Sequence, residues 1–206
     1  MAASELTGRN GLDRRSVTRA LVSACPDALI IAGLGSASYD VYAAGDRSCN
    51  FYLWGAMGGA AAMGLGLALA QPRRPVLVLT GDGEQLMGLG ALATIGIQRA
   101  ANLTIAVLDN GRYAETGMQR SHTADGVDLT KVAAACGFAW TVDVDTMQAI
   151  TALGARIQAM QGGGFARVKI SAKEEPRALP TRDGVWLKNR FRSALGMRID
   201  DITTLK

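Results

Sequence analysis

The sequence predicts an α/β fold, a doubly wound parallel sheet with helices on both faces. Short apolar segments without polar alternation recur along the chain, segments of helical periodicity separate them, and glycines or polar residues follow them. Continuous apolar strands are typical of parallel sheets that are covered on both faces. Strands that alternate with helices through short connections join by right-handed crossovers. In such a sheet we expect ligands at the carboxyl ends of the strands.

The first part of the chain predicts two helix–strand pairs. Apolar residues recur at helical spacing over residues 13–24, and Pro26 ends this helix. Residues 28–32 form a short apolar strand that is rich in β-branched side chains. Residues 58–70 predict a helix of small residues, and residues 75–80 predict a second apolar strand.

The same alternation continues toward the C-terminus. A helix is expected over residues 86–99 and a strand over residues 103–108. The next elements are a helix over 129–136, a strand over 140–144, a helix over 147–160 and a strand over 166–170. Residues 173–183 are expected to form an exposed connection to a helix around residues 186–195.

The composition is that of a folded protein. The chain is 49% hydrophobic and 19% charged, which allows a core of full domain size. We expect residues 1–206 to form a single domain, with 173–206 as a C-terminal extension. The net charge of +4 is mild and most basic residues are scattered, so nucleic acid is not expected as a partner.

The cysteines and the hydropathy of the sequence predict the cellular compartment of the protein. The three cysteines form no CxxC pair, which excludes zinc-knuckle and iron–sulfur ligand sets and favours a reduced, cytoplasmic protein. Residues 1–16 lack the apolar core of a secretory signal. Residues 51–70 carry no charge over a bilayer-spanning length, but their five glycines favour a glycine turn followed by a buried helix. A membrane is therefore not expected as a partner.

Polar residues that follow two predicted strands indicate a metal site. Asp82 lies between Gly81 and Gly83 directly after one strand, and Asn110 follows the next strand 28 positions later. Neighbouring parallel strands would bring the Asp82 carboxylate and the Asn110 amide oxygen to one ion, and Mg²⁺ commonly shares such oxygen ligands with phosphate. The glycines let a diphosphate approach the backbone, and a helix that begins near Glu84 would offer it N–H groups. Glu84 itself is expected to cap that helix.

Further segments accompany these residues. They are DR at 46–47, NFY at 50–52, LM at 86–87, GALAT at 90–94 and TGMQ at 116–119. Together with GDG and the asparagine turn they resemble the pyrophosphate domain of thiamine diphosphate (TPP)-dependent enzymes. The resemblance runs from about residue 15 to residue 170 and is closest to the β subunits of sulfopyruvate decarboxylase and the matching half of phosphonopyruvate decarboxylase. It implies TPP and Mg²⁺ as cofactors, with Asp82, Asn110 and the Arg112 backbone carbonyl as Mg²⁺ ligands.

The resemblance also implies contacts to the cofactor. The Gly55 carbonyl would accept a hydrogen bond from the 4′-amino group of the pyrimidine, and the Met57 side chain would wedge between the two rings. Ser36 and Ser38 lie in a segment similar to the family's hydroxyl-bearing turn near the diphosphate. The candidate catalytic residues follow the Mg²⁺ turn and are Tyr113, Glu115, Gln119 and His122.

The resemblance finally implies a second chain. TPP enzymes activate the cofactor with a glutamate from another domain, for which this chain has no room, so we expect a separate α subunit in an α₂β₂ or larger assembly. The expected reaction is decarboxylation of a small 2-oxo acid. A TPP-dependent carboligase that forms an acyloin or an acetohydroxy acid, and a non-catalytic subunit with a relict site, remain alternatives. Glu115 stands where the relatives usually have serine, so the sequence does not identify the oxo acid.

Overall fold

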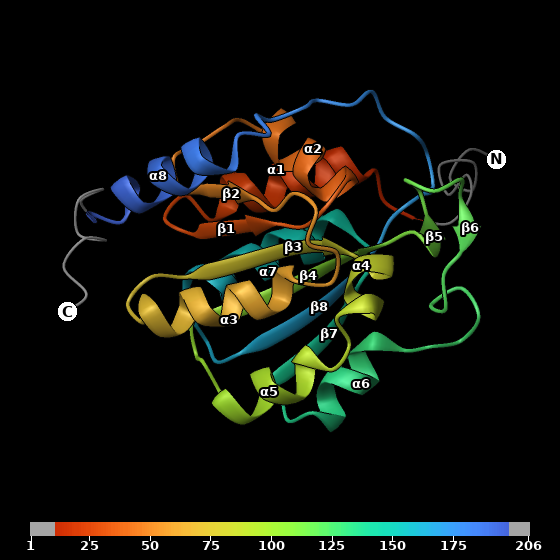
Figure 1. Cartoon of the computed structure of the whole chain (residues 1–206). Coiled ribbons are helices and arrows are strands. Elements are labelled where there is room, and N and C mark those ends of the chain that lie inside the picture. Colours follow the sequence, from red (N-terminus) through yellow and green to blue (C-terminus); the bar gives the residue numbers. More distant parts are fainter. Residues whose placement is uncertain (1–10, 198–206) are drawn as a thin grey trace.

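A computed structural model describes residues 11–197, which contain a six-stranded sheet between two layers of helices (Figure 1). The strand order is β2–β1–β3–β4–β8–β7, and all neighbouring strands are parallel. The strands are β1 (Leu29–Ala32), β2 (Asn50–Tyr52), β3 (Val76–Gly81), β4 (Leu103–Asp109), β7 (Trp140–Val144) and β8 (Gly164–Lys169). The predicted doubly wound parallel sheet is confirmed.

Helices cover both faces of this sheet, each over its own apolar core. One layer consists of α1 (Arg14–Ala24), α2 (Ser36–Ala43) and α7 (Met147–Gln158). The other layer consists of α3 (Ala60–Ala70), α5 (Ala91–Gln98) and α6 (Leu129–Ala135). Adjacent residues of β1 serve different cores, because Ile30 faces the first layer and Leu29 and Ile31 face the second. Each fully buried side chain of this kind stabilises the fold by about 1.5–3 kcal/mol.

The last helix, α8 (Gly184–Ala194), packs against the edge strand β2. The Arg190 Nη2 atom donates to the backbone carbonyl oxygen of Asn50 at 2.8 Å, and the Phe191 and Phe51 rings lie 5.7 Å apart between centroids. An unpaired strand edge is otherwise free to pair with another chain. The C-terminal helix therefore protects this edge of the sheet.

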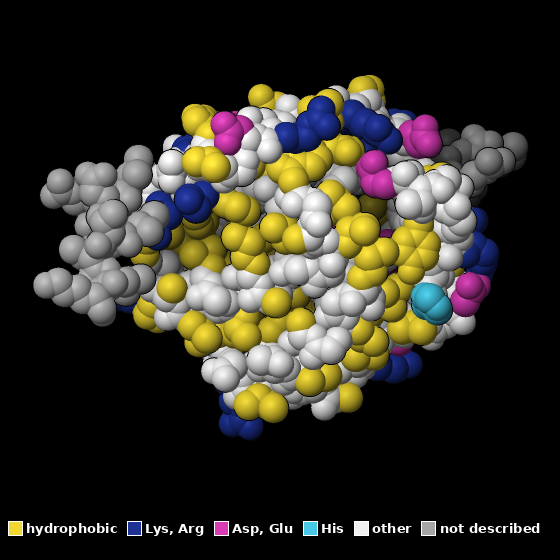
Figure 2. All heavy atoms as spheres, in the orientation of Figure 1, with side chains coloured by type: hydrophobic (Ala, Val, Ile, Leu, Met, Phe, Trp, Pro, Cys, Tyr) yellow, Lys and Arg dark blue, Asp and Glu magenta, His cyan; other side chains and the backbone are white. Residues whose placement is uncertain are grey.

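The uncharged segment 51–70 contains the end of β2, a glycine-bearing loop and α3, which agrees with the predicted turn and helix. Between residues 11 and 197, no helix has both the length and the apolar character needed to cross a membrane. One side of α3 is exposed at Ala62, Gly66 and Leu69. Figure 2 shows the face that α3 and α5 form as largely apolar and uncharged, with basic side chains near its margins.

The prediction of one continuous helix over residues 86–99 is wrong, because the structure has two helices in this region. α4 (Asp82–Met87) begins directly after β3, and α5 follows a short break. Gly88 lies in this break, where a Cβ atom would stand 2.1 Å from the carbonyl oxygen of Gly58. The close approach of the two glycine backbones interrupts the helix.

Neither β2 nor α2 is predicted by the sequence. β2 has three residues at the edge of the sheet, too few for a periodic pattern. α2 begins at Ser36, inside the segment expected to be a hydroxyl-bearing turn. The predictions on the N-terminal signal and on the extension to residue 206 fall partly on residues 1–10 and 198–206, which lie outside the described residues.

Candidate cofactor site

The two polar turns meet at the carboxyl edge of the sheet, where the strand order reverses. β2 lies on one side of β1, at the edge of the sheet, whereas β3 and then β4 lie on the other side of β1. Gly81 of β3 is paired in register with Leu108 of β4, so Asp82 and Asn110 follow neighbouring strands. Open α/β sheets bind ligands at such a switch point.

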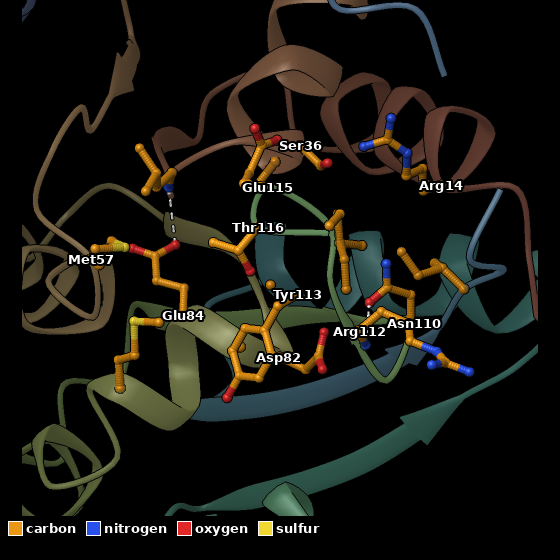
Figure 3. A pocket seen from close by; sticks show the side chains of 18 residues that line it. Arg14, Ser36, Met57, Asp82, Glu84, Asn110, Arg112, Tyr113, Glu115 and Thr116 are labelled. Atoms are coloured by element: carbon orange, nitrogen blue, oxygen red, sulfur yellow. Dashed lines mark hydrogen bonds between the residues drawn. The ribbon is translucent and has the colours of Figure 1, made fainter. Parts of the chain in front are cut away.

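A cleft opens at this point (Figure 3). Ten of the residues predicted from the sequence line it: Ser36, Met57, Gly81, Asp82, Gly83, Glu84, Asn110, Arg112, Tyr113 and Glu115. They come from four segments of the chain: the start of α2, the loop before α3, the junction of β3 and α4, and residues 110–115 after β4. The fold therefore gathers most of the predicted site in one place.

Asp82 is a buried carboxylate at the base of the cleft. Its side chain is 2% exposed, and its Oδ2 atom accepts hydrogen bonds from the hydroxyls of Ser121 and Thr123, the latter at 3.1 Å. Burial raises the pKa of this carboxyl group, and the nearby negative charge of Asp109 raises it further. A divalent cation would relieve both effects by compensating the buried charge.

Asn110 supplies an amide oxygen on the same side of the cleft (Figure 3). Its Oδ1 atom accepts from the backbone N–H of Arg112 at 2.9 Å, which fixes the amide and leaves a second lone pair on the oxygen. In the described part of the chain, no three His, Cys, Asp or Glu residues gather into a metal cluster. A set of one carboxylate, one amide oxygen and a backbone carbonyl fits Mg²⁺, which takes few protein ligands when phosphate supplies others.

Ser121 and Thr123 are site residues that the sequence did not reveal. A short antiparallel hairpin, β5 (Arg112–Tyr113) and β6 (Gln119–Arg120), returns the chain so that both hydroxyls reach Asp82. Thr123 Oγ1 also lies 2.8 Å from Asp109 Oδ1, so its single hydroxyl hydrogen is shared between the two carboxylates. Hydroxyl residues after a turn have no periodic signal, so only the tertiary structure identifies these two.

Glu84 does not cap α4, and this prediction is wrong. Its Oε2 atom accepts from the backbone N–H of Leu34 at 3.0 Å and from the Thr80 hydroxyl at 2.7 Å. Burial raises the pKa of the Glu84 carboxyl group. A Cβ atom on Gly33 would stand 1.9 Å from Oε2, so glycine is required there for the approach. Glu84 therefore ties the end of β1 to the end of β3 across the switch point.

Tyr113 and Glu115 form the outer wall of the cleft. The Tyr113 ring packs on Gly83, where an added Cβ atom would lie 2.5 Å from the ring. Glu115 forms an ion pair with Arg177, with 3.3 Å between Oε2 and Nη2. Arg177 lies in the connection 171–183, which thereby adds a charge partner to the site.

Four predicted residues do not line the cleft. Ser38 is buried, and its hydroxyl donates to the Gly33 carbonyl oxygen at 2.7 Å. Gly55 is exposed in the loop before α3, with a positive φ of 71°. The Gln119 side chain bonds to Thr116 within the hairpin. His122 is exposed, and Figure 2 shows the one histidine of the chain on the surface.

Comparisons with known proteins agree with this geometry. Residues 34–170 match the family described as thiamine pyrophosphate enzyme, C-terminal TPP binding domain. The chain is 42% identical over 159 residues to sulfopyruvate decarboxylase subunit beta of Methanothermobacter thermautotrophicus, which covers 77% of this chain and 82% of that protein. It is 47% identical over 123 residues to phosphonopyruvate decarboxylase of Streptomyces viridochromogenes, covering 60% of this chain and only 30% of that protein.

Solved structures show the same fold. The thiamine diphosphate-dependent 4-hydroxybenzoylformate decarboxylase of Rhodococcus jostii RHA1 has a TM-score of 0.66 at 22% identity, over 80% of this chain and 34% of that chain. This likeness concerns the fold alone. The family match spans well over half of the chain, and the conclusion follows that the protein belongs to the thiamine pyrophosphate enzymes and carries their C-terminal TPP-binding domain.

Proposed function

We propose that this chain is the β subunit of a two-chain, TPP- and Mg²⁺-dependent decarboxylase of a small 2-oxo acid. The observation that carries the proposal is the buried Asp82 carboxylate, which lies beside Asn110 at the switch point of the sheet. The similarity to a protein named sulfopyruvate decarboxylase subunit beta, over 82% of its length, supports both the reaction class and the two-chain assembly.

The residues of this chain would hold the diphosphate end of the cofactor. Asp82, Asn110 and the Arg112 carbonyl would bind Mg²⁺, and Ser121 and Thr123 would orient the Asp82 carboxylate toward the ion. Gly81 lines the cleft, and a Cβ atom there would meet nothing within 4 Å, so a phosphate can approach its backbone. Bound TPP supplies a thiazolium carbon that adds to a ketone and accepts the electrons left by departing carbon dioxide.

The opposite end of the cleft is apolar and would hold the rings. Met57 and Met87 are 61% and 55% exposed there, unusual values for methionine side chains on a folded domain. Met57 would wedge between the rings, and the Gly55 carbonyl would accept from the pyrimidine. Tyr113 and Glu115 would contact the substrate from the outer wall.

The activating carboxylate would come from a partner α subunit. Both glutamates that line the cleft already have partners, because Glu84 binds Leu34 and Thr80 and Glu115 binds Arg177. These contacts orient both carboxylates within this chain, which supports a separate source for the activating glutamate. We propose an α₂β₂ or larger assembly, placed in the cytoplasm because Cys25, Cys49 and Cys136 are all free thiols.

The test is to express this chain with the product of an adjacent reading frame that encodes a pyrimidine-binding domain. We expect Mg²⁺-dependent TPP binding and release of carbon dioxide from pyruvate, sulfopyruvate or phosphonopyruvate. Products are analysed with and without an acceptor aldehyde, because a carboligase would form an acyloin or acetohydroxy acid instead of an aldehyde.

The control is Asp82→Ala, which should abolish TPP retention in the same assembly. Unchanged TPP affinity in this variant contradicts the Mg²⁺ assignment. Absence of Mg²⁺-dependent TPP binding by the wild-type assembly contradicts the proposed function and favours a subunit with a relict site.

A further inference from the structure

Arg14 is a buried cation on the wall of the cleft. It is the first residue of α1, it is 7% exposed, and it lines both the cleft and a second pocket that adjoins it at Ser36 and Asn110. Buried charged side chains are normally paired and fully hydrogen-bonded. Arg14 has an ion-pair partner, but its Nη1 atom is not hydrogen-bonded within the described residues.

The carboxylate beside Arg14 is shared between two arginines. Arg14 Nη1 lies 3.2 Å from Asp40 Oδ2, yet neither atom has a hydrogen-bond partner within residues 11–197. Arg15 Nε donates to the other oxygen, Asp40 Oδ1, at 3.1 Å. Two guanidinium groups therefore face one buried carboxylate. The nearby Asp13 carboxylate accepts from the Ser16 backbone N–H, so Arg14 keeps a donor to spare.

The position of Arg14 along the cleft determines which part of the cofactor it can meet. Figure 3 shows Met57 at one end of the cleft, Arg14 and Asn110 toward the other, and Asp82 between them. Rings that contact Met57 would leave the diphosphate to extend past Asp82 toward Arg14. α2 begins at Ser36 on the same wall as Arg14, so the free N–H groups of its first turn add donors for an anion.

The other cations near the cleft have acceptors of their own. Arg112 Nη1 donates to the Met118 carbonyl oxygen at 3.4 Å, and Arg177 is paired with Glu115. Asp82 and Glu84 contribute negative charge, which opposes binding of an anion unless cations offset it. Arg14 is placed to provide that offset on the wall opposite the strand ends.

We infer that Arg14 binds the terminal phosphate of the cofactor, an assignment that rests on the proposed function. Its guanidinium donates to the phosphate oxygens from the side of α1 and α2, while the metal ion held by Asp82 and Asn110 binds them from the strand side. Arginine suits this task because its planar fork can donate two parallel hydrogen bonds to one phosphate. Arg15 has the same partner, Asp40, but lines neither pocket, and it provides a matched control.

Isothermal titration calorimetry on the co-expressed two-chain assembly with Mg²⁺ tests the inference, using TPP, thiamine monophosphate and inorganic diphosphate as separate probes. Arg14→Met should weaken TPP and diphosphate binding by about 10- to 100-fold, the range expected for a lost charge-assisted hydrogen bond. The same substitution should affect thiamine monophosphate much less. Arg15→Met, which also removes an Asp40 partner, should leave all three affinities nearly unchanged.

Two further variants separate binding from folding. Arg14→Lys keeps the charge and should retain part of the affinity, whereas Asp40→Asn removes the competing carboxylate and should tighten diphosphate binding. Circular dichroism establishes that each variant is folded. If Arg14→Met does not fold, Arg14→Lys and Asp40→Asn decide the outcome.

Three results overturn the assignment. They are unchanged TPP affinity in folded Arg14→Met, equal losses for TPP and thiamine monophosphate, and no gain in Asp40→Asn when Arg14→Met is unusable. If the wild-type two-chain assembly binds neither TPP nor diphosphate in the presence of Mg²⁺, the proposed function fails as well. Wild-type binding that is insensitive to Arg14 contradicts this inference alone.

Discussion

Asp82→Asn should stabilise the cofactor-free chain while it abolishes cofactor binding. Burial raises the pKa of the Asp82 carboxyl group, so the fold favours its protonated form. The stability that this preference contributes is present at acidic pH and is lost as the pH rises through the folded-state pKa. At neutral pH the wild type therefore carries an unfavourable buried charge, which the neutral asparagine removes. The hydroxyls of Ser121 and Thr123 can rotate to suit an amide.

The expected gain is about 1–2 kcal/mol, because a buried charge that is only partly hydrogen-bonded carries a penalty of this order. For a chain of this length each kcal/mol raises the unfolding temperature by about 2–4 °C. Thermal unfolding followed by circular dichroism measures the difference between variant and wild type at neutral pH. It should shrink as the pH falls and wild-type Asp82 becomes protonated.

The same experiment with Mg²⁺ and TPP reverses the order of stability. A ligand at about 100 times its dissociation constant stabilises the wild type by about 2.7 kcal/mol, and Asp82→Asn should show none of this shift. The reasoning is refuted if the cofactor-free variant unfolds below the wild type at neutral pH, or if its advantage persists unchanged at acidic pH.

Three further predictions concern packing, positioning and pH. Gly64→Ala should destabilise the chain by about 1–3 kcal/mol in urea unfolding, because its Cβ atom would lie 2.2 Å from Val78 Cγ2. Gly66→Ala in the same helix would meet nothing within 4 Å, so it should raise the free energy of unfolding by about 0.5–1 kcal/mol. A loss of stability in both variants would contradict the packing argument. Ser121→Ala should weaken Mg²⁺-dependent TPP binding by about tenfold, by the magnitude of one hydrogen bond to a charged group, and unchanged calorimetric affinity would remove Ser121 from the site. Burial raises the pKa of the Cys25 thiol to about 11 from its ordinary value of 9.0, so stability should fall as the pH rises through this window, and Cys25→Ser should flatten that part of the pH profile.

The sequence predicts those elements whose burial leaves an unbroken apolar pattern. β3 and β4 are covered on both faces, so each is marked by a continuous apolar segment of the chain. β2 has only three residues, which pair with β1 and pack against α8, and three residues are too few to show a pattern of their own. The break at Gly88 has its cause at Gly58, 30 positions earlier, so no local pattern reveals it.

The site divides in the same way. Asp82 and Asn110 are predictable, because parallel pairing of consecutive strands brings their ends together. The contacts of Glu84 are not, because its partner Leu34 belongs to a strand end 50 positions earlier in the sequence. His122 is exposed and does not line the cleft, and its predicted catalytic role stays a prediction.

The backbone contact between Gly58 and Gly88 joins the two ends of the cleft mechanically. Gly58 follows Met57, whereas Gly88 directly follows the helix that starts at Asp82. A displacement of the loop before α3 would push on α4, so the ring end and the metal end shift as a unit. A substitution that shifts the backbone at the ring end should therefore also shift the metal end. A larger side chain at either glycine would disturb both ends.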